Sequence, residues 1–320
     1  MTRHTEHAVW AEGLTKSFKE TKALVGVDLA VRTGTVHGVL GPNGAGKTTA
    51  VRILTTLLRA DAGRALVGGF DVTTESAKIR AQIGLTGQYA SVDEMLTGFE
   101  NLLLIGRLLG FTRPQAKARA GEMLERFALS HAADRAAKTF SGGMRRRLDL
   151  AASLIGGPRI LFLDEPTTGL DPHARNELWA IVRELVAEGV TVLLTTQYLE
   201  EADQLADEIA VIDHGRVIAT GAPEELKSKV GGQVLYVRAE RGHDAGVVAR
   251  LLAEVAGREV TAEGEGLTVP VTDTKVMPAA ALRLESAGIE VAEFSLRRPS
   301  LDEVFLTLTG APAHQAEVPA

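Results

Sequence analysis

The sequence predicts an α/β fold with a mixed sheet and a helical insertion, followed by a small α+β domain. Short aliphatic runs alternate with helical patterns up to about residue 230, and the order of these patterns changes after Lys227–Gly232. A chain of 320 residues, 45% apolar and 24% charged, suits one large globular domain and a smaller one. We therefore expect domains over residues 1–228 and 229–310, and a disordered tail over residues 311–320.

The composition excludes several kinds of function. The chain has no cysteine, which excludes disulfides, thiolate metal sites and cysteine nucleophiles. Its net charge of −6 argues against a broad basic surface, so we expect no nucleic-acid partner. Residues 1–10 lack the apolar core of a signal peptide, and no apolar run approaches the roughly 20 residues that cross a bilayer. Any work at a membrane is therefore expected on its cytoplasmic face and through another chain.

The large domain is expected to contain a mostly parallel sheet of buried strands. Compact aliphatic runs predict these strands at Val36–Leu40, Ile160–Leu163, Val190–Thr195 and Ile209–Ile212. Two earlier runs, Val9–Phe18 and Leu24–Val31, are expected to form an antiparallel flank. Residues 92–139 are rich in Leu, Ala, Arg and Glu and predict a helical insertion, with helices beginning near Gly98 and Pro114.

The C-terminal domain has a different order of elements. The patterns predict a strand at Val234–Val237, a helix along Val247–Val255, strands near residues 259–262 and 267–271, a helix at Pro278–Ala287 and a strand at Ile289–Phe294. This β-α-β-β-α-β order indicates a ferredoxin-like unit, closed by a short helix at Leu301–Leu308. Nothing in the sequence of this domain resembles a catalytic or metal-binding constellation.

A glycine-rich loop follows the first buried strand. Gly41-Pro42-Asn43-Gly44-Ala45-Gly46-Lys47-Thr48 matches the G-x-x-x-x-G-K-[ST] pattern and precedes a helical run. Glycines allow backbone N–H groups to converge on phosphate oxygens, and the helix N-terminus adds its positive dipole end. Lys47 is then suited to neutralise the β- and γ-phosphates, and the Thr48 hydroxyl to ligate Mg²⁺. The loop predicts a nucleoside triphosphate and Mg²⁺ as ligands.

Two carboxylates end the second buried strand. Asp164 stands at the carboxyl end of Ile160–Leu163, where it can hold Mg²⁺ through water. Glu165 is one step further on and would point elsewhere, toward an attacking water. Taken alone, the pair is equally consistent with a solvated strand end, but together with the phosphate loop it predicts a hydrolytic site.

A third motif, Ser141-Gly142-Gly143, narrows the possible classes of nucleotide-hydrolysing protein. It opens a helix shortly before the strand that ends in Asp164. Ser-Gly-Gly in this position between the two motifs resembles the signature of ABC (ATP-binding-cassette) ATPases. The resemblance implies that Ser141 and the amides after it bind the γ-phosphate held by the other protomer of a homodimer. The basic triplet Arg145-Arg146-Arg147 that follows is interpreted as a solvated helix face rather than a phosphate or partner contact.

The resemblance implies roles for further residues. ATP is expected to contact Gly41, Pro42, Asn43, Gly44, Ala45, Gly46, Lys47, Thr48 and Thr49. Phe18 falls where an aromatic ring stacks on adenine. Gln88 falls at the lid glutamine that touches Mg²⁺ and the attacking water and senses the membrane partner. Asp171 belongs to the loop that crosses the dimer interface, and its position before Pro172 also predicts a helix N-cap.

One position departs from the family pattern. The family usually has His after the strand that follows the paired carboxylates, and here Gln197 stands there. Glutamine donates a hydrogen bond but carries no charge, so electrostatic stabilisation of the transition state is reduced. With Glu165 intact we expect hydrolysis, slowed by the missing charge; a subunit that binds ATP but turns over little is the alternative.

The resemblance extends to one group within the superfamily. The stretches Thr86–Glu94, Ser141–Asp149, Thr195–Leu205 and Leu301–Leu306 are similar to the daunorubicin/doxorubicin-resistance ATP-binding subunits of drug exporters. This implies efflux of a hydrophobic drug or secondary metabolite, driven from the cytoplasmic face of the cell membrane through a separately encoded permease.

Other classes fit less well. An ABC ATPase acting on ribosomes usually carries two cassettes, and only one phosphate loop is present. DNA-repair types insert long coiled coils between Lys47 and Ser141, and this interval is too short for one. A P-loop kinase or GTPase is disfavoured by the Ser-Gly-Gly motif and by the lack of an Asn-Lys-x-Asp tetrad.

Overall fold

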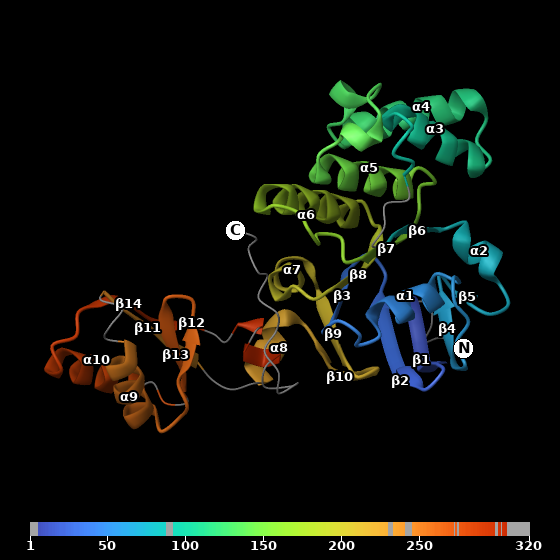
Figure 1. The fold of residues 1–320 in the computed structure, drawn as a ribbon. Coiled ribbons are helices and arrows are strands. Elements are labelled where there is room, and N and C mark those ends of the chain that lie inside the picture. Colours follow the sequence, from blue (N-terminus) through green and yellow to red (C-terminus); the bar gives the residue numbers. More distant parts are fainter. Residues whose placement is uncertain are drawn as a thin grey trace. The chain divides into compact units, whose positions relative to one another are not determined.

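A computed structural model describes residues 6–87, 92–229, 233–240, 245–271, 273, 275–297, 300–301 and 303–305. The chain divides into two compact units, Met1–Gly221 and Ala222–Ala320, each with its own core (Figure 1). Helix α8 (Pro223–Lys229) falls in the second unit, whereas residues up to 228 were expected in the large domain. The residue at which the two domains separate stays a prediction.

The central sheet of the first unit is mostly parallel, as predicted. Its strands are β3 (Val36–Leu40), β6 (Ile83–Thr86), β7 (Ile160–Asp164), β8 (Thr191–Thr196), β9 (Glu208–Asp213) and β10 (Arg216–Gly221). They lie in the order β10-β9-β3-β8-β7-β6, and only β10 pairs antiparallel. The four predicted buried strands are confirmed, whereas β6 and β10 were not predicted.

An antiparallel sheet flanks the central one. It contains β1 (His7–Phe18), β2 (Thr21–Arg32), β4 (Ala62–Val67) and β5 (Phe70–Asp71), in the order β2-β1-β4-β5. Helix α1 (Lys47–Leu54) lies between β3 and β4 in the sequence, and helix α2 (Ser76–Arg80) lies between β5 and β6. Residues of this flank and of α1 share a core with Ile160 and Phe162 of β7.

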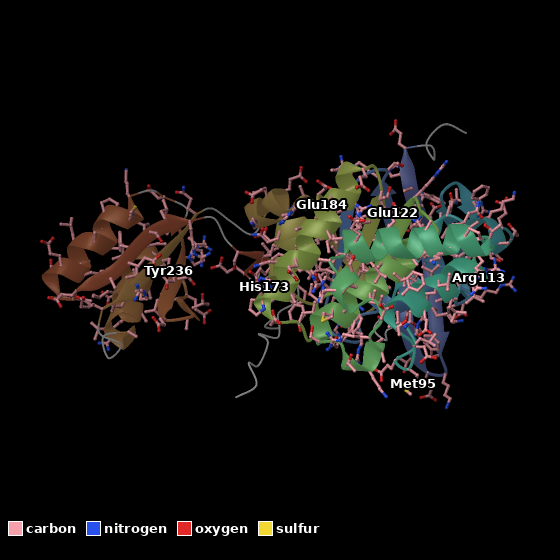
Figure 2. The ribbon with its side chains drawn as sticks, turned by 90° about the horizontal axis from the view of Figure 1, so that it is seen from above. Met95, Arg113, Glu122, His173, Glu184 and Tyr236 are labelled. Atoms are coloured by element: carbon pink, nitrogen blue, oxygen red, sulfur yellow. The ribbon has the colours of Figure 1, made fainter. Side chains whose placement is uncertain are left out.

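The opposite face of the central sheet is covered by helices. Leu161 and Leu163 share a core with residues of α3 (Gly98–Leu108), α4 (Arg113–Arg126), α5 (Gly142–Leu154) and α6 (Pro172–Ala187). Two 3₁₀ turns, η1 (Ser130–Ala132) and η2 (Ala137–Thr139), join α4 to α5, and α7 (Leu199–Leu205) follows β8. Strand β7 is therefore buried on both faces, which explains its uninterrupted aliphatic run. Figure 2 looks onto this layer, with Arg113 and Glu122 marking α4 and His173 and Glu184 marking α6.

The predicted β-α-β-β-α-β order of the second unit is confirmed. Its elements are β11 (Gln233–Ala239), α9 (Ala245–Ala256), β12 (Thr261–Glu263), β13 (Gly266–Val271), α10 (Val276–Ser286) and β14 (Val291–Arg297). The strands pair antiparallel in the order β12-β13-β11-β14, which is the ferredoxin-like arrangement. Leu235 and Val237 of β11 pack against Val248 and Leu252 of α9 in its core. The end of the predicted helix Leu301–Leu308 and the expected tail lie outside the described residues.

Candidate nucleotide-binding and catalytic site

The carboxyl ends of three parallel strands bring the predicted site residues together. In the strand register, Leu40 of β3 lies opposite Thr196 of β8, and Asp164 of β7 lies opposite Thr195. The Gly41 amide continues this contact and donates to the Thr196 carbonyl at 3.4 Å. Ligands of open α/β sheets bind at this edge, so the topology itself indicates where to look.

The glycine-rich loop passes from β3 into α1 with two residues in the left-handed region. Gly44 has φ 82° and Gly46 has φ 110°, and a Cβ on Gly46 would lie 2.5 Å from the Ala23 carbonyl oxygen. Gly46 is the N-cap of α1, and among the described residues no side chain caps that first turn. The amide groups at the start of α1 therefore remain available to an anion.

The Lys47 side chain folds back across the loop. Its Nζ donates to the carbonyl oxygens of Gly41 at 2.7 Å and Pro42 at 3.2 Å, and lies 3.5 Å from Glu165 Oε1. Its side chain is only 4% exposed. Burial lowers the pKa of Lys47, and the carboxylates of Glu165 and Asp164 oppose that shift. An anion bound in the loop would oppose it further, because it favours the charged amine.

Asp164 is held by two hydroxyl groups. Its Oδ1 accepts hydrogen bonds from Thr195 Oγ1 at 2.6 Å and from Thr48 Oγ1 at 3.1 Å. Thr48 and Asp164 are 116 residues apart in sequence, and the fold places them in contact. Because the Thr195 side chain is fully buried, this hydrogen bond fixes the carboxylate from the protein side.

The arrangement of Thr48 and Asp164 suits Mg²⁺. A hydroxyl and a carboxylate oxygen are the hard ligands this ion prefers, and Mg²⁺ usually completes its shell with water and substrate phosphates. Among the described residues no cluster of three or more His, Asp or Glu side chains could hold a metal by itself. A shared protein–nucleotide site fits these residues better than a protein cage.

Glu165 is aimed by an unusual backbone conformation. Its φ is 52°, in the left-handed region that non-glycine residues seldom occupy. Its amide donates to the Thr195 carbonyl at 3.1 Å and to Thr195 Oγ1 at 3.2 Å. Its carboxylate lies beside Lys47 Nζ and accepts from Thr168 Oγ1 at 3.5 Å. The turn thus directs Glu165 toward the phosphate loop, while Asp164 points into the sheet edge.

A pocket of about 280 Å³ joins these residues to Phe18. Its lining includes Phe18, the loop from Pro42 to Thr49, and Glu165. Phe18 is 47% exposed, and the Lys16 amine lies 5.7 Å from its ring centre. An exposed aromatic ring at the rim of a phosphate loop has an open face for a planar base.

The predicted helix starts at Ser141 and Asp171 are observed. Ser141 Oγ accepts from the Met144 amide at 3.2 Å and caps α5, so Gly142 and Gly143 form its first turn. Asp171 Oδ1 accepts from the Ala174 amide at 2.8 Å and caps α6. These caps are compatible with a further role at an interface, which stays a prediction.

The two predicted glutamines have different outcomes. Gln88 lies outside the described residues. Gln197 follows β8 directly, beside Thr196, whose carbonyl accepts from Gly41. Gln197 is therefore at the same strand edge as the phosphate loop, and its role there stays a prediction.

The interpretation of the arginine triplet as a solvated helix face was wrong most clearly for Arg146. Arg145 pairs with Glu94 at 2.7 Å and Arg147 with Glu177 at 3.5 Å, but the Arg146 side chain is only 13% exposed. Its guanidinium turns inward and donates to the backbone carbonyls of Gly87, Glu165 and Pro166. Nothing in three consecutive arginines shows which one faces inward.

Glu201 is a further residue near the site that was not identified from the sequence. This residue of α7 is fully buried, and its Oε1 accepts from Trp179 Nε1 at 3.3 Å. Burial raises the pKa of Glu201, and the Trp179 indole and the Arg146 guanidinium oppose the rise. The signal in the sequence was a Glu on the apolar face of a short helix, four positions after Gln197.

Comparison with known families agrees with this geometry. Residues 24–168 match the family model described as ABC transporter, and residues 221–309 match the model described as ATP-binding protein DrrA1-3-like, C-terminal domain. Among solved structures, the ADP conformation of an ATP-binding cassette of an ABC transporter has a TM-score of 0.63 and 31% identity, over 69% of this chain and 93% of the other. A dimeric, post-hydrolysis cassette bound to ADP and Pi has a TM-score of 0.62 and 25% identity, over 67% and 98%. These matches define the first unit as an ATP-binding cassette.

Relatives match along almost the whole chain. The daunorubicin resistance ATP-binding protein DrrA2 of Streptomyces coeruleorubidus is 56% identical, over 97% of this chain and 98% of the relative. The daunorubicin/doxorubicin resistance ATP-binding protein DrrA of Streptomyces peucetius is 52% identical, over 98% and 96%. The chain belongs to the ABC transporter ATP-binding family, whose members are ATPases coupled to transport. Cassettes of this family bind ATP or ADP, form dimers and work with membrane permeases. Every helix among the described residues is too short or too polar to cross a membrane.

Proposed function

We propose that this chain is the ATP-hydrolysing subunit of an exporter that moves a hydrophobic, anthracycline-like drug or secondary metabolite through a separately encoded permease. One observation supports the hydrolytic part: Lys47, Thr48, Asp164 and Glu165 meet at one strand edge with their polar atoms within 3.5 Å of a neighbour in the group. The drug and the separate permease are inferred from the relatives that confer daunorubicin or doxorubicin resistance. The family also supports a peripheral position at the cytoplasmic face of the membrane.

Each residue has a defined task in this proposal. Bound Mg-ATP supplies the phosphoryl group that is cleaved. The backbone amides within Gly41–Thr49 hold its phosphates, Lys47 leaves the loop carbonyls to neutralise them, and Phe18 stacks on the adenine. Thr48, Asp164 and Gln88 would hold Mg²⁺, which would offset the negative charge of the phosphates. Glu165 orients the attacking water and accepts its proton, while Gln197 donates a neutral hydrogen bond to the γ-phosphate.

Two copies of the chain complete the sites. Ser141, Gly142 and Gly143 of one copy bind the nucleotide held by the other, and Asp171 lies at the interface between them. Ser141 and Gly142 at the start of α5 are exposed, which supports this, because first-turn amides and the helix dipole favour an anion. The dimeric cassette bound to ADP and Pi is a precedent in a relative.

The permease is proposed to dock beside α3. A groove of about 290 Å³ is lined by Ile83 and Leu85 of β6 and by Ile105 and Leu109 at the end of α3. Leu108 is 77% exposed next to it. Apolar side chains around a concave surface indicate a protein contact. Crosslinks from the permease that map only to the C-terminal domain would contradict this docking site.

Mg-ATP hydrolysis by the purified chain, alone and with its permease in lipid, tests the proposal. We expect turnover that Glu165→Gln abolishes while ATP binding is retained. Transport of a fluorescent anthracycline into inverted vesicles tests the substrate class separately. ATP binding without turnover, even with the permease, would instead identify a nucleotide-gated binding subunit.

A further inference from the structure

Arg146 connects three parts of the first unit that are far apart in sequence. Its Nη1 donates to the Gly87 carbonyl at 2.9 Å, 59 residues away. Its Nε donates to the Pro166 carbonyl at 2.7 Å, and its Nη2 donates to the Glu165 carbonyl at 3.2 Å. One planar group on α5 therefore holds both the residue before Gln88 and the backbone of the catalytic turn.

The surroundings of Arg146 keep its charge in place. Asp149, one helical turn further along α5, is fully buried, and its Oδ2 lies 3.4 Å from Arg146 Nη1. Guanidinium is a rigid fork of five N–H donors, so it can satisfy several fixed carbonyls at once. Lysine offers three donors at a single nitrogen and cannot span the same acceptors.

The turn that Arg146 contacts contains a residue with a strained backbone conformation. Glu165 occupies the left-handed region with φ 52°, a conformation that persists only where the surrounding structure fixes it. The carbonyls of Glu165 and Pro166, two consecutive residues of this turn, both accept from Arg146. A shift of this backbone would move the Glu165 carboxylate away from the phosphate loop.

We propose that Arg146 is a positioning residue that ties the backbone before Gln88 to the turn that aims Glu165. The inference rests on the proposed role of Glu165 in hydrolysis. The docking groove proposed above is lined by Ile83 and Leu85 of β6, the strand that leads to Gly87, so a permease bound there would shift Gly87, and the guanidinium would transmit that shift to the Glu165–Pro166 backbone. Arg146 thus sets both the basal rate and the response of the ATPase to the permease.

The test is Arg146→Lys in the full chain, assayed alone and with the permease in lipid. Binding of a fluorescent ATP analogue and the KM for ATP should stay within about threefold, because the phosphate loop with Lys47 is unchanged and only the position of Glu165 is affected. The value of kcat should fall roughly 10- to 100-fold, since a small misplacement of a catalytic group costs rate rather than binding. Stimulation by the permease should fall toward none.

The matched control is Arg126→Lys, since Arg126 forms a surface ion pair with Glu188 at 2.7 Å. This variant should leave both kcat and the stimulation by the permease unchanged. An Arg146→Lys protein with the kcat and the stimulation of the wild type would overturn the proposal. An equal loss in Arg126→Lys would also overturn it, because the effect would then not be particular to Arg146.

A second variant covers the case in which Arg146→Lys does not fold. Arg146→Gln combined with Asp149→Asn removes the two charges of this buried pair together, so the fully buried Asp149 carboxylate does not lose its ion-pair partner. The same loss of kcat with retained nucleotide binding is expected, and wild-type kcat in this double variant would equally refute the positioning role.

Glu165→Gln in the same assay separates the two proposals. If Glu165→Gln abolishes turnover and the Arg146 variants do not lower it, only the role of Arg146 fails. If the wild type shows no turnover that depends on Glu165, the proposed function fails and the role of Arg146 falls with it.

Discussion

Replacing Thr195 with valine removes one hydroxyl from the strand edge of the candidate site while nearly preserving the volume of the side chain. Thr195 is fully buried, and its Oγ1 donates to Asp164 Oδ1 at 2.6 Å. A hydrogen bond to a charged group contributes about 1.5–3 kcal/mol, and a valine at this buried position offers no substitute donor. The Glu165 amide loses the same hydroxyl as an acceptor but keeps the Thr195 carbonyl at 3.1 Å.

The size of the expected effect follows from these contacts. We expect Thr195→Val to lower the free energy of unfolding by about 1.5–3 kcal/mol. If Asp164 is held less firmly when Mg-ATP reacts, the same energy corresponds to a loss of roughly 10- to 150-fold in kcat/KM. Thr195→Ser is the control, because it keeps the hydroxyl and loses one methyl group, worth about 0.8 kcal/mol.

Two measurements test whether the Thr195 hydroxyl has this effect: urea unfolding of the apo protein, and ATP turnover as a function of Mg²⁺ concentration. The valine variant should need more Mg²⁺ for half-maximal turnover, whereas the serine variant should not. A valine variant with the Mg²⁺ requirement and unfolding curve of the wild type would refute the reasoning. So would a serine variant as impaired as the valine variant, because the methyl group and not the hydroxyl would then matter.

Three further changes have expected outcomes. Burial raises the pKa of Glu201, so the native state binds its proton more tightly than the unfolded state. The stability of the protein should therefore fall as the pH rises from the ordinary glutamate value of 4.5 through the pKa of Glu201 in the folded state. Glu201→Gln should flatten this dependence of Tm on pH. Lys47→Ala should abolish the rise in Tm that ATP causes, because the loop loses the amine that neutralises the phosphates; a rise in Tm equal to that of the wild type would contradict this role of Lys47. Gln197→His should raise kcat with little change in KM, since a histidine can carry charge in the transition state; equal or slower turnover would show that the glutamine costs nothing.

The fold was predictable from the sequence where burial is complete. Strand β7 has every residue buried, so its aliphatic run Ile160–Leu163 stood out, and β3 was predicted with the bounds that it has in the structure. Strand β10 alternates between exposed and partly buried residues at the sheet edge, and β6 has only four residues. Such short or half-exposed strands leave a weak pattern, which explains why both were missed.

The site was predictable where its chemistry lies in one continuous motif. Gly41–Thr48 and Asp164-Glu165 are recognisable from residue type and spacing. Thr195 and Arg146 act on partners 31 and 59 residues away, and those contacts exist only once the strands are paired. Consecutive residues of a helix point about 100° apart, so only the packed structure shows that Arg146 is the arginine that faces the catalytic turn.

The turn at Glu165 owes its shape to a balance between backbone strain and the contacts that oppose it. A non-glycine residue in the left-handed region costs on the order of 1–3 kcal/mol, and Glu165 is such a residue. Thr195 and Arg146 hold its backbone with several hydrogen bonds, each worth about 0.5–1.5 kcal/mol net. Removing one of these hydrogen bonds leaves the strand and helix cores intact. It reduces the energy that opposes the strain, so the turn can move to a relaxed backbone conformation. Substitutions around the turn should therefore lower kcat by more than their effect on Tm suggests, whereas substitutions in the cores that flank β7 should lower Tm first.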